Sequence, residues 1–395
     1  MGFSGTALLP LVSEADIQAL LVDIGLPRAT SAVPLNAAAD YHSIYILSFD
    51  SHPKLTDLSG DRVLENEIVE LVLRVAGTQI PSTKTINEIA SIEWVRKNTE
   101  NIPVPIILRF DASTTNALKH EYTLMSKVSG ISVDRIYNNL SQTAKDSLVE
   151  QLASIVHELH SHTWDRVGGL AFDIQGDIIP GLVVEETFWQ TQDLPLWNDG
   201  TLLEDLNISG PFSTYGGYAL AHLGKYNYMI NKHSKLKPFR SLEPHIQALE
   251  KSIVLKAGAV NDVRYILAHR DLHFGNILCD PETCKITAVL DWEFAGVCPA
   301  FRWNPVRAFL WNCQKIDQSQ DEKDALFQKF EAICLSSYPR LLEGTKPNKT
   351  QELVSTAINH LRAIIEVSVK GGAVDRISAW ESIFTESVDA LSHVA

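Results

Sequence analysis

The chain has 395 residues, of which 45% are hydrophobic and 21% are charged, so it can bury a large core and is unlike disordered or fibrous chains. Its 34 basic and 48 acidic residues give a net charge of −14, which argues against nucleic acid or an anionic membrane as the main partner. Five cysteines without C-x-x-C spacing favour reduced thiols and a cytoplasmic protein. No segment has the roughly 20 consecutive apolar residues of a membrane span.

The first third of the chain predicts one helix and a small antiparallel sheet. Ser13 is a suitable cap for a helix that extends to Leu26, because apolar residues recur there with helical spacing. Four strands are expected, and the first two are rich in β-branched and aromatic residues. They are Tyr41–Phe49, Ile68–Val75, Ile106–Phe110 and Glu121–Met125. Between the second and the third of them, apolar residues with a three-residue spacing predict a helix over Asn87–Arg96.

Beyond residue 126 the sequence becomes mainly helical. Ala144–His162 places its leucines and isoleucines on one face, which is typical of a long core helix, and Leu242–Lys256 is expected to form another helix. Three further helices are predicted near the C-terminus. They are Glu322–Tyr338, Gln351–Val369 and Asp375–His393.

The interval between Arg166 and Lys225 contains no lysine or arginine, but it is rich in carboxylates and aromatic rings. The carboxylates are Asp173, Asp177, Glu185, Glu186, Asp193, Asp199, Glu204 and Asp205, and the rings are Phe188, Trp189, Trp197, Phe212, Tyr215 and Tyr218. Carboxylates and aromatic faces together can bind an ammonium group. The alternative is a solvated acidic insertion whose aromatic residues lie in the core.

The stretch His269–Leu278 carries the residues best suited to chemistry. Asp271 and Asn276 lie five positions apart, and short apolar runs on both sides present them from a rigid frame. A carboxylate can orient a hydroxyl group, and carboxylate or amide oxygens are ligands that Mg²⁺ prefers. A hairpin turned by Asp280–Thr283 is expected to return Asp291 to the side of this loop.

The order of these motifs resembles one known family. H-x-D-x-x-x-x-N, then an apolar strand, then L-D-W-E is similar to the aminoglycoside phosphotransferase and choline kinase group, and the step Ile102–Pro105 resembles its fungal members. The resemblance implies an α+β, two-lobed, protein-kinase-like fold. Residues 1–126 are then expected to form a nucleotide-binding N-lobe with an antiparallel sheet. Residues 127–395 form a larger helical C-lobe with the catalytic loop and substrate site.

The same resemblance implies roles for the loop residues in a transfer of phosphate from ATP. Asp271 orients or deprotonates the substrate hydroxyl, and His269 supports the loop by hydrogen bonding. Asn276 and Asp291 are expected to hold Mg²⁺ on the nucleotide phosphates.

The resemblance also implies a nucleotide site in the N-lobe. Arg74, alone among apolar residues, stands where a lysine is expected to touch the phosphates, and its planar fork also matches phosphate oxygens. Glu88, in preference to Glu93, is the expected ion-pair partner of Arg74. Backbone groups from Met125 to Lys127 are expected to face the adenine.

One segment departs from the family pattern. Kinases carry a glycine-rich phosphate loop where this chain has Pro34–Asp40, which contains three alanines and no glycine. We therefore assign no phosphate contact to this segment.

The sequence predicts an ATP- and Mg²⁺-dependent kinase that phosphorylates a hydroxyl of a small, possibly cationic molecule, such as an aminoglycoside or choline-like compound. A kinase acting on protein side chains is one alternative, although no D-F-G or A-P-E motif is present. A nucleotide-binding regulator without turnover is another. The missing glycines and Arg74 favour that regulator, whereas Asp271, Asn276 and Asp291 argue against it.

Overall fold

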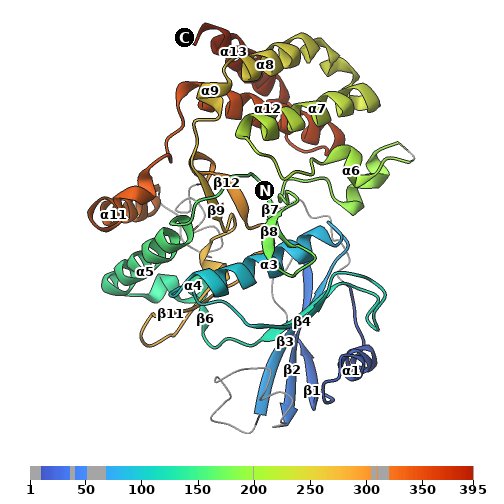
Figure 1. Ribbon diagram of the computed structural model, residues 1–395, viewed down its shortest axis with the longest axis vertical. Coiled ribbons are helices and arrows are strands. Elements are labelled where there is room, and N and C mark those ends of the chain that lie inside the picture. The colour runs from blue at the N-terminus through green and yellow to red at the C-terminus, as the bar shows by residue number, and fades with distance from the viewer. Residues whose placement is uncertain are drawn as a thin grey trace.

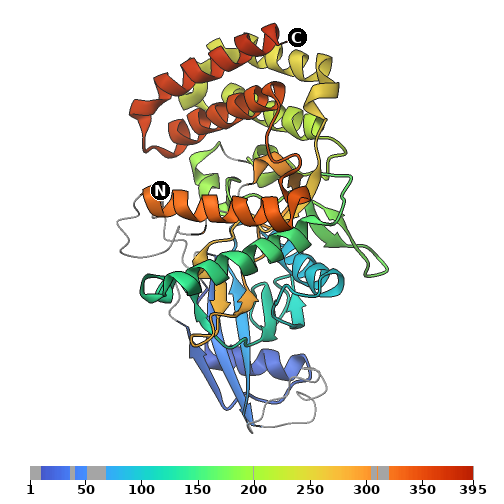
Figure 2. The ribbon, with the colours of Figure 1, turned by 90° about the vertical axis from the view of Figure 1, so that its left-hand side faces the viewer.

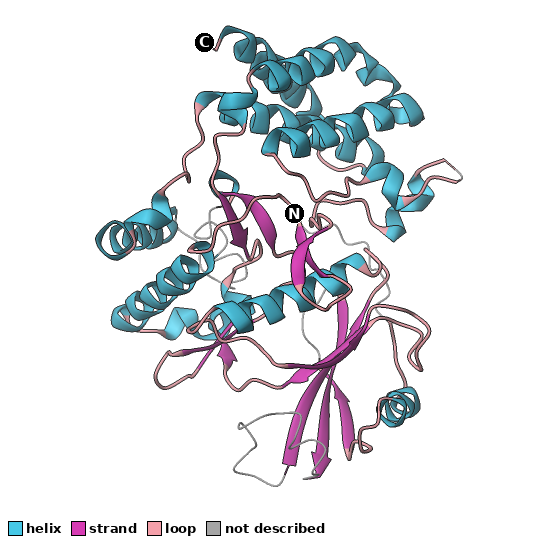
Figure 3. Ribbon diagram, viewed as in Figure 1, coloured by secondary structure: helices cyan, strands magenta, loops and turns pink. Residues whose placement is uncertain are grey.

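The structure is a computed structural model, and the residues that it describes are 10–35, 41–50, 68–198, 200–303, 309 and 320–394. Figure 1 shows a β-sheet region at one end of the long axis and a helical region at the other. The chain therefore has the two-lobed α+β architecture that the sequence predicts, with strands concentrated in the smaller lobe (Figure 3).

The N-lobe is a five-stranded antiparallel sheet in the order β1-β2-β3-β5-β4. Its strands are β1 (Ser31–Pro34), β2 (His42–Asp50), β3 (Ile68–Ala76), β4 (Ile107–Asp111) and β5 (Tyr122–Ser126). Helix α1 (Glu14–Asp23) begins at Ser13, whose hydroxyl accepts a hydrogen bond from the backbone N–H of Asp16 as the predicted cap. Alternate residues of the strands, including Leu47, Leu73 and Leu124, pack with α1 in one apolar core.

Helix α3 (Thr83–Asn98) lies between the sheet and the rest of the molecule (Figure 1). Its residues Ala90, Ile92 and Val95 belong to the same buried cluster as Leu152 of helix α5 (Gln142–His160). The helix thus shares its core with the C-lobe, although it precedes two strands of the N-lobe sheet in the chain.

Short strands frame the catalytic stretch in the C-lobe. They are β6 (Ile131–Ser132), β7 (Gly169–Phe172), β8 (Ile178–Gly181), β9 (Tyr265–Ala268), β10 (Ile277–Cys279), β11 (Ile286–Val289) and β12 (Gly296–Pro299). Strands β10 and β11 form the predicted hairpin, with β6 added at its edge, and β9 pairs with β12. The segment 269–276 therefore leaves one strand pair and enters another, so both of its ends are fixed.

Helices form the far end of the C-lobe. The longer ones are α7 (Tyr215–Lys232), α8 (Glu243–Leu255), α11 (Gln320–Ser337), α12 (Lys349–Lys370) and α13 (Ile377–His393). Short helical segments connect them and the strands. These are α4 (Val133–Ile136), η2 (Tyr137–Asn139), η3 (Thr191–Leu196), α6 (Leu203–Leu206), η4 (Ser234–Leu242), α9 (Ala257–Val260), η5 (Phe274–Asn276), η6 (Ala300–Arg302), η7 (Pro339–Leu342) and η8 (Val374–Arg376).

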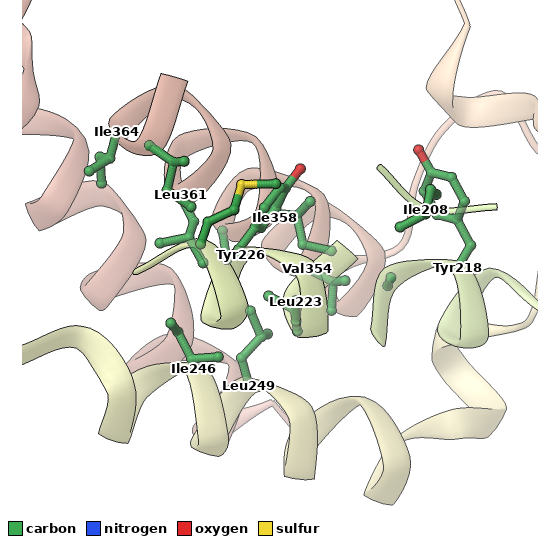
Figure 4. Packing of buried hydrophobic residues seen from close by; sticks show 14 of the residues in the cluster. Ile208, Tyr218, Leu223, Tyr226, Ile246, Leu249, Val354, Ile358, Leu361 and Ile364 are labelled. Atoms are coloured by element: carbon green, nitrogen blue, oxygen red, sulfur yellow. The ribbon is translucent and has the colours of Figure 1, made fainter. Parts of the chain in front are cut away.

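Four of these helices share one apolar core. Leu223 of α7, Leu249 of α8 and Ile358 of α12 meet in it, as Figure 4 shows, and residues of α13 join the same cluster. Figure 2 shows α12 and α13 lying side by side above α11 and α5. Within the residues that the structure describes, no helix is both long enough and apolar enough to cross a membrane.

The acidic interval is more ordered than its composition indicates. It contains the β7–β8 hairpin and the first part of helix α7, and its rings Trp189, Trp197 and Tyr218 are buried in the helical core. Of the two interpretations, the one that places the aromatic residues in the core agrees with the structure, because their large apolar area is buried against α7 and α12.

Candidate active site

Asp271 lies in the connection between β9 and η5 and is held by hydrogen bonds on both sides. The side-chain amide of Asn276 donates to the backbone carbonyl of Asp271 at 2.9 Å and to its carboxylate Oδ2 at 3.1 Å. The Asp271 side chain is 40% exposed, and Nε2 of His273 lies 3.7 Å from Oδ2. The carboxylate is therefore oriented by the loop and still open to a substrate.

The protonation of Asp271 suits a base at neutral pH. Burial, together with the negative charges of Asp291 and Glu186, raises the pKa of Asp271 to about 7. A carboxylate with such a pKa accepts a proton more readily than an ordinary one, which is the property of a general base near pH 7.

His269 is buried directly before this residue. Its Nε2 donates to the carbonyl of Leu290 at 2.8 Å, and its Nδ1 accepts from the backbone N–H of Asp271 at 3.3 Å. The edge of Trp292 packs against the ring at a centroid distance of 4.5 Å. Burial lowers the pKa of His269 to about 4, so the ring is neutral at physiological pH. Both nitrogens are engaged, and His269 acts on the loop as a positioning residue.

Asn276 and Asp291 offer a suitable pair of oxygens for Mg²⁺. The hairpin β10–β11 returns the chain so that the backbone N–H of Leu290 donates to the carbonyl of Asn276 at 2.8 Å, which brings Asp291 beside the loop. Asp291 has a left-handed backbone with φ 66°, and its side chain is 32% exposed. Amide and carboxylate oxygens in pairs, completed by water and phosphate, are the usual set for Mg²⁺. The donor set therefore fits this ion.

Arg74 connects the sheet to both sides of the site. Its guanidinium bonds Glu88 of α3 through Nη1, and Nη2 lies 2.8 Å from Oδ1 of Asp291 and 3.1 Å from Nδ1 of His42. Burial alone would raise the pKa of Asp291, but the charge of Arg74 and its hydrogen bond outweigh burial and leave that pKa below the ordinary value. Glu93 instead contacts Arg96 at 2.8 Å on the helix surface.

The nucleotide end of the site has an unused donor. Nε of Arg74 is buried and has no hydrogen-bond partner among the described residues. A buried donor of this kind costs free energy until an acceptor reaches it, and a phosphate oxygen is a suitable acceptor. The local chemistry of Arg74 therefore fits a nucleotide phosphate.

The sequence did not indicate a second buried ion pair beside the first. Nζ of Lys84 donates to Oε2 of Glu293 at 2.8 Å and lies 3.3 Å from Nε2 of His42, with both charged side chains almost fully buried. Burial raises the pKa of Glu293, although the charge of Lys84 opposes that rise. Glu293 is the last residue of the L-D-W-E motif, and its place in that motif was the only feature of the sequence that could have indicated its role.

Asn87 is a further residue that the sequence did not single out. Its side chain donates to the carbonyls of Glu293 at 2.9 Å and Ala295 at 2.8 Å, and its oxygen accepts from the N–H of Leu170 at 2.7 Å. These bonds attach α3 to β7 and to the segment that follows Asp291. Glu88, one residue on, is thereby held in place for Arg74.

The remaining predicted nucleotide residues lie at the C-terminal end of β5, an inner strand of the sheet. Met125 is buried in β5 opposite Val72, and Lys127 is exposed just after that strand, where its side chain pairs with Glu70. The side chain of Lys127 is thus occupied, and only its backbone is left to face an adenine. Of the glycine-free segment, Asn36–Asp40 lies outside the described residues.

A sequence comparison finds a fungal relative. The subtelomeric hrmA-associated cluster protein of Aspergillus fumigatus (strain CBS 144.89 / FGSC A1163 / CEA10) is 21% identical over 260 residues, which cover 55% of this chain and 51% of that protein. The chain thus spans about half the length of the curated relatives it matches.

Structural comparison finds solved structures that are similar to this chain. The structure of APH(2")-IIa in complex with gentamicin matches with a TM-score of 0.50 at 14% identity, covering 98% of this chain and 97% of that one. Plasmodium vivax ethanolamine kinase matches with a TM-score of 0.46 at 12% identity, covering 93% of this chain and 86% of that one. The first of these matches confirms the kinase-like fold that the sequence predicts.

A family model identifies the chain more directly than these distant relatives. The model of the phosphotransferase enzyme family matches residues 61–301, which include Arg74, Glu88, the stretch 269–278 and Asp291. This match spans more than half of the chain and confirms the family resemblance expected from its motifs. The chain belongs to the phosphotransferase enzyme family.

Proposed function

We propose that this protein is an ATP- and Mg²⁺-dependent kinase that phosphorylates a hydroxyl group of a small molecule. The observation that carries the proposal is the convergence of Asp271, Asn276, Asp291 and Arg74, which come from separate segments of the chain. An oriented carboxylate, two metal-ligating oxygens and a phosphate-binding cation are the parts that phosphoryl transfer needs.

Each residue has a distinct task in this proposal. Asp271 accepts the hydrogen bond, and finally the proton, of the acceptor hydroxyl, and Asn276 and His269 fix its direction. Asn276 and Asp291 would hold Mg²⁺, which supplies charge neutralisation on the phosphates when bound. Arg74 binds a phosphate oxygen, and Glu88 keeps its guanidinium in position.

A cationic acceptor is consistent with the charges near Asp271. Glu186 is exposed and lies close enough to raise the pKa of Asp271, and the chain as a whole carries −14. Aminoglycosides and amino alcohols, the compound classes in the names of the two structural relatives, are therefore the first acceptors to test. We place the reaction in the cytosol because four cysteines of the described chain are free thiols.

The proposal is tested by Mg²⁺-dependent ATP consumption with a panel of aminoglycosides, amino alcohols and neutral polyols. We expect one class of acceptor to stimulate turnover and Asp271→Asn to reduce kcat at least a hundredfold, while the KM for ATP changes little. Asp375→Asn makes the same charge change at an exposed, remote position and should leave turnover unchanged.

Two results would contradict the proposal in different ways. ATP binding without turnover on any acceptor would favour a nucleotide-binding regulator, an alternative supported by the contact between Arg74 and the metal-ligating oxygen of Asp291. Turnover that survives Asp271→Asn would show that another group is the base.

A further inference from the structure

A cavity of about 150 Å³ lies behind the catalytic loop, where the loop meets α7 and the end of β12. Its polar wall is formed by Glu185, Tyr218, Arg270, Cys298 and Arg302. Arg270 is the residue directly before Asp271, so the cavity adjoins the candidate active site through one peptide unit. None of these five side chains has a task in the phosphoryl transfer proposed above.

Glu185, the only carboxylate among these five residues, already accepts two hydrogen bonds. Nη2 of Arg270 donates to Oε1 of Glu185 at 2.9 Å, and the hydroxyl of Tyr218 donates to the same oxygen at 2.6 Å. Burial would raise the pKa of Glu185, but the positive charge of Arg270 outweighs burial and lowers it to about 2. Glu185 is therefore ionised at neutral pH and balances one arginine.

Arg302 has no carboxylate partner of this kind among the described residues. It contacts the hydroxyl of Tyr218, and its guanidinium carbon lies 5.0 Å from the centre of that ring. Within the described ranges, no carboxylate lies within 4.0 Å of Arg302. Burial lowers the pKa of the neighbouring His222 to about 4, so that ring is neutral. Among the described residues that line the cavity, two arginines and one carboxylate give one excess positive charge, which the solvent-exposed Arg302 carries.

We infer that this cavity binds a small oxyanion, a phosphate or a carboxylate group, between Arg270 and Arg302. Arginine presents paired N–H donors that match such oxygens, and an anion would remove the excess charge. The volume admits a small ion with a few waters, whereas pockets for drug-sized ligands usually measure about 300 Å³ or more. The site is therefore distinct in charge and size from a site for a polycationic acceptor.

The backbone of Arg270 supports a role for its side chain. This residue has a φ of 70°, a left-handed conformation that glycine adopts freely and arginine adopts at a cost. Arginine gains contacts that glycine cannot make, namely Glu185 and the carbonyl of Val184 at 3.2 Å. An anion bound at Arg270 would therefore affect the backbone conformation at Asp271, the next residue.

The oxyanion has two possible sources, a free ion or the acidic group of a larger ligand. Calorimetric titration of the whole chain with inorganic phosphate and with glycerol 3-phosphate, each at constant ionic strength, separates them. Tighter binding of phosphate indicates the free ion, and tighter binding of glycerol 3-phosphate indicates the larger ligand. Glycerol is the neutral control. We expect Arg302→Gln to weaken the tighter probe about tenfold or more.

Three variants make this result specific. Arg28→Gln removes the same charge at an exposed site in the N-lobe and should leave binding unchanged. Arg74→Gln removes the phosphate contact proposed for the nucleotide site, so any binding that this variant abolishes belongs to that site and any binding that it retains belongs to the cavity. Tyr218→Phe removes the hydroxyl that holds Arg302, and it should weaken binding even if Arg302→Gln fails to fold.

The inference is overturned if neither probe binds the unaltered chain, or if Arg74→Gln abolishes binding while Arg302→Gln and Tyr218→Phe do not. Because the readout is binding, it stands apart from the proposed kinase activity. A chain without turnover that still binds phosphate through Arg302 would contradict the proposed function and leave this inference intact.

Discussion

Nη2 of Arg74 lies 2.8 Å from Oδ1 of Asp291, although 217 residues separate the two positions. One residue is on the N-lobe sheet, and the other follows the β10–β11 hairpin of the C-lobe. Through this contact and the Arg74–Glu88 pair, a single guanidinium links the sheet, α3 and the carboxylate that we propose binds Mg²⁺.

Replacement of Arg74 should therefore affect both nucleotide use and stability. Arg74→Gln leaves Glu88 buried without a partner, so we expect a loss of about 3 kcal/mol in the free energy of unfolding. Its kcat/KM for ATP should fall at least a hundredfold. Arg74→Lys keeps one charge for Glu88 and should retain most of the stability. Urea unfolding and ATP kinetics on both variants test this, and equal behaviour of the two would contradict it.

Asn276 should determine the Mg²⁺ concentration that turnover requires. Asn276→Ala removes one of two ligating oxygens and also the amide that orients Asp271, so the Mg²⁺ concentration at half-maximal turnover should rise about tenfold. Asn276→Asp keeps an oxygen at the position, but it replaces the N–H donor to Asp271 with a second negative charge. We expect its Mg²⁺ requirement to stay within a few-fold of the unaltered chain, while its kcat falls. Turnover measured across a Mg²⁺ series separates these outcomes.

The buried pair Lys84–Glu293 should show strong coupling. Lys84→Met removes the ion-pair partner of Glu293 in the core, so the carboxyl must stay charged without lysine or bind a proton, and we expect a cost of about 3 kcal/mol. The double variant Lys84→Met, Glu293→Gln removes the stranded charge and should be more stable than Lys84→Met alone. A double-mutant cycle by urea unfolding gives the coupling directly. Additive losses would show that the two side chains do not depend on each other.

His160 should make the fold sensitive to acid. Burial, followed by the positive charge of Arg264, lowers its pKa to about 3, whereas an unfolded histidine has 6.5. Between these pH values the unfolded chain binds one more proton, so the free energy of unfolding falls as the pH falls from 6.5 towards 3. Above pH 6.5 the effect vanishes. At pH 5 it amounts to about 2 kcal/mol.

A variant pair isolates this contribution. His160→Leu removes the titrating ring from a buried position, so its stability should fall less between pH 7 and pH 5 than that of the unaltered chain. His393→Leu, at an exposed position, should show the ordinary pH dependence. Urea unfolding at both pH values provides the comparison. An unchanged pH dependence in His160→Leu would assign the acid sensitivity to other groups.

Local patterns predicted most of the secondary structure, because burial of one face of a helix or strand makes apolar residues recur at a regular spacing in the sequence. The strands β2 and β3 and the helix α5 lie within two residues of their predicted limits. The hairpin that returns Asp291 was also foreseeable, since its turn residues sit between two short apolar runs. The spacing of Asp271 and Asn276 within one loop placed them together without tertiary information.

Helix α3 shows why other parts of the site were not foreseeable. Lys84, Asn87 and Glu88 are polar residues that are nearly fully buried, so the helix lacks the clear polar and apolar faces from which burial is usually inferred. Lys84 and Asn87 both bond Glu293, about 200 residues away, and no local period records such a pairing. The aromatic residues of the acidic interval were ambiguous for a related reason, since ring composition alone does not distinguish a core from a cage.

The hydrogen bonds of Asn87 have a consequence for how the lobes can move. Because Asn87 and Lys84 attach α3 to Leu170, Glu293 and Ala295, this helix is mechanically part of the C-lobe. The contacts Arg74–Glu88, Lys84–His42 and Thr85–Glu121 tie the same helix to the sheet side. A motion between the sheet and the C-lobe would therefore have to loosen one of these two sets of contacts, so the flexible boundary need not follow the order of the chain.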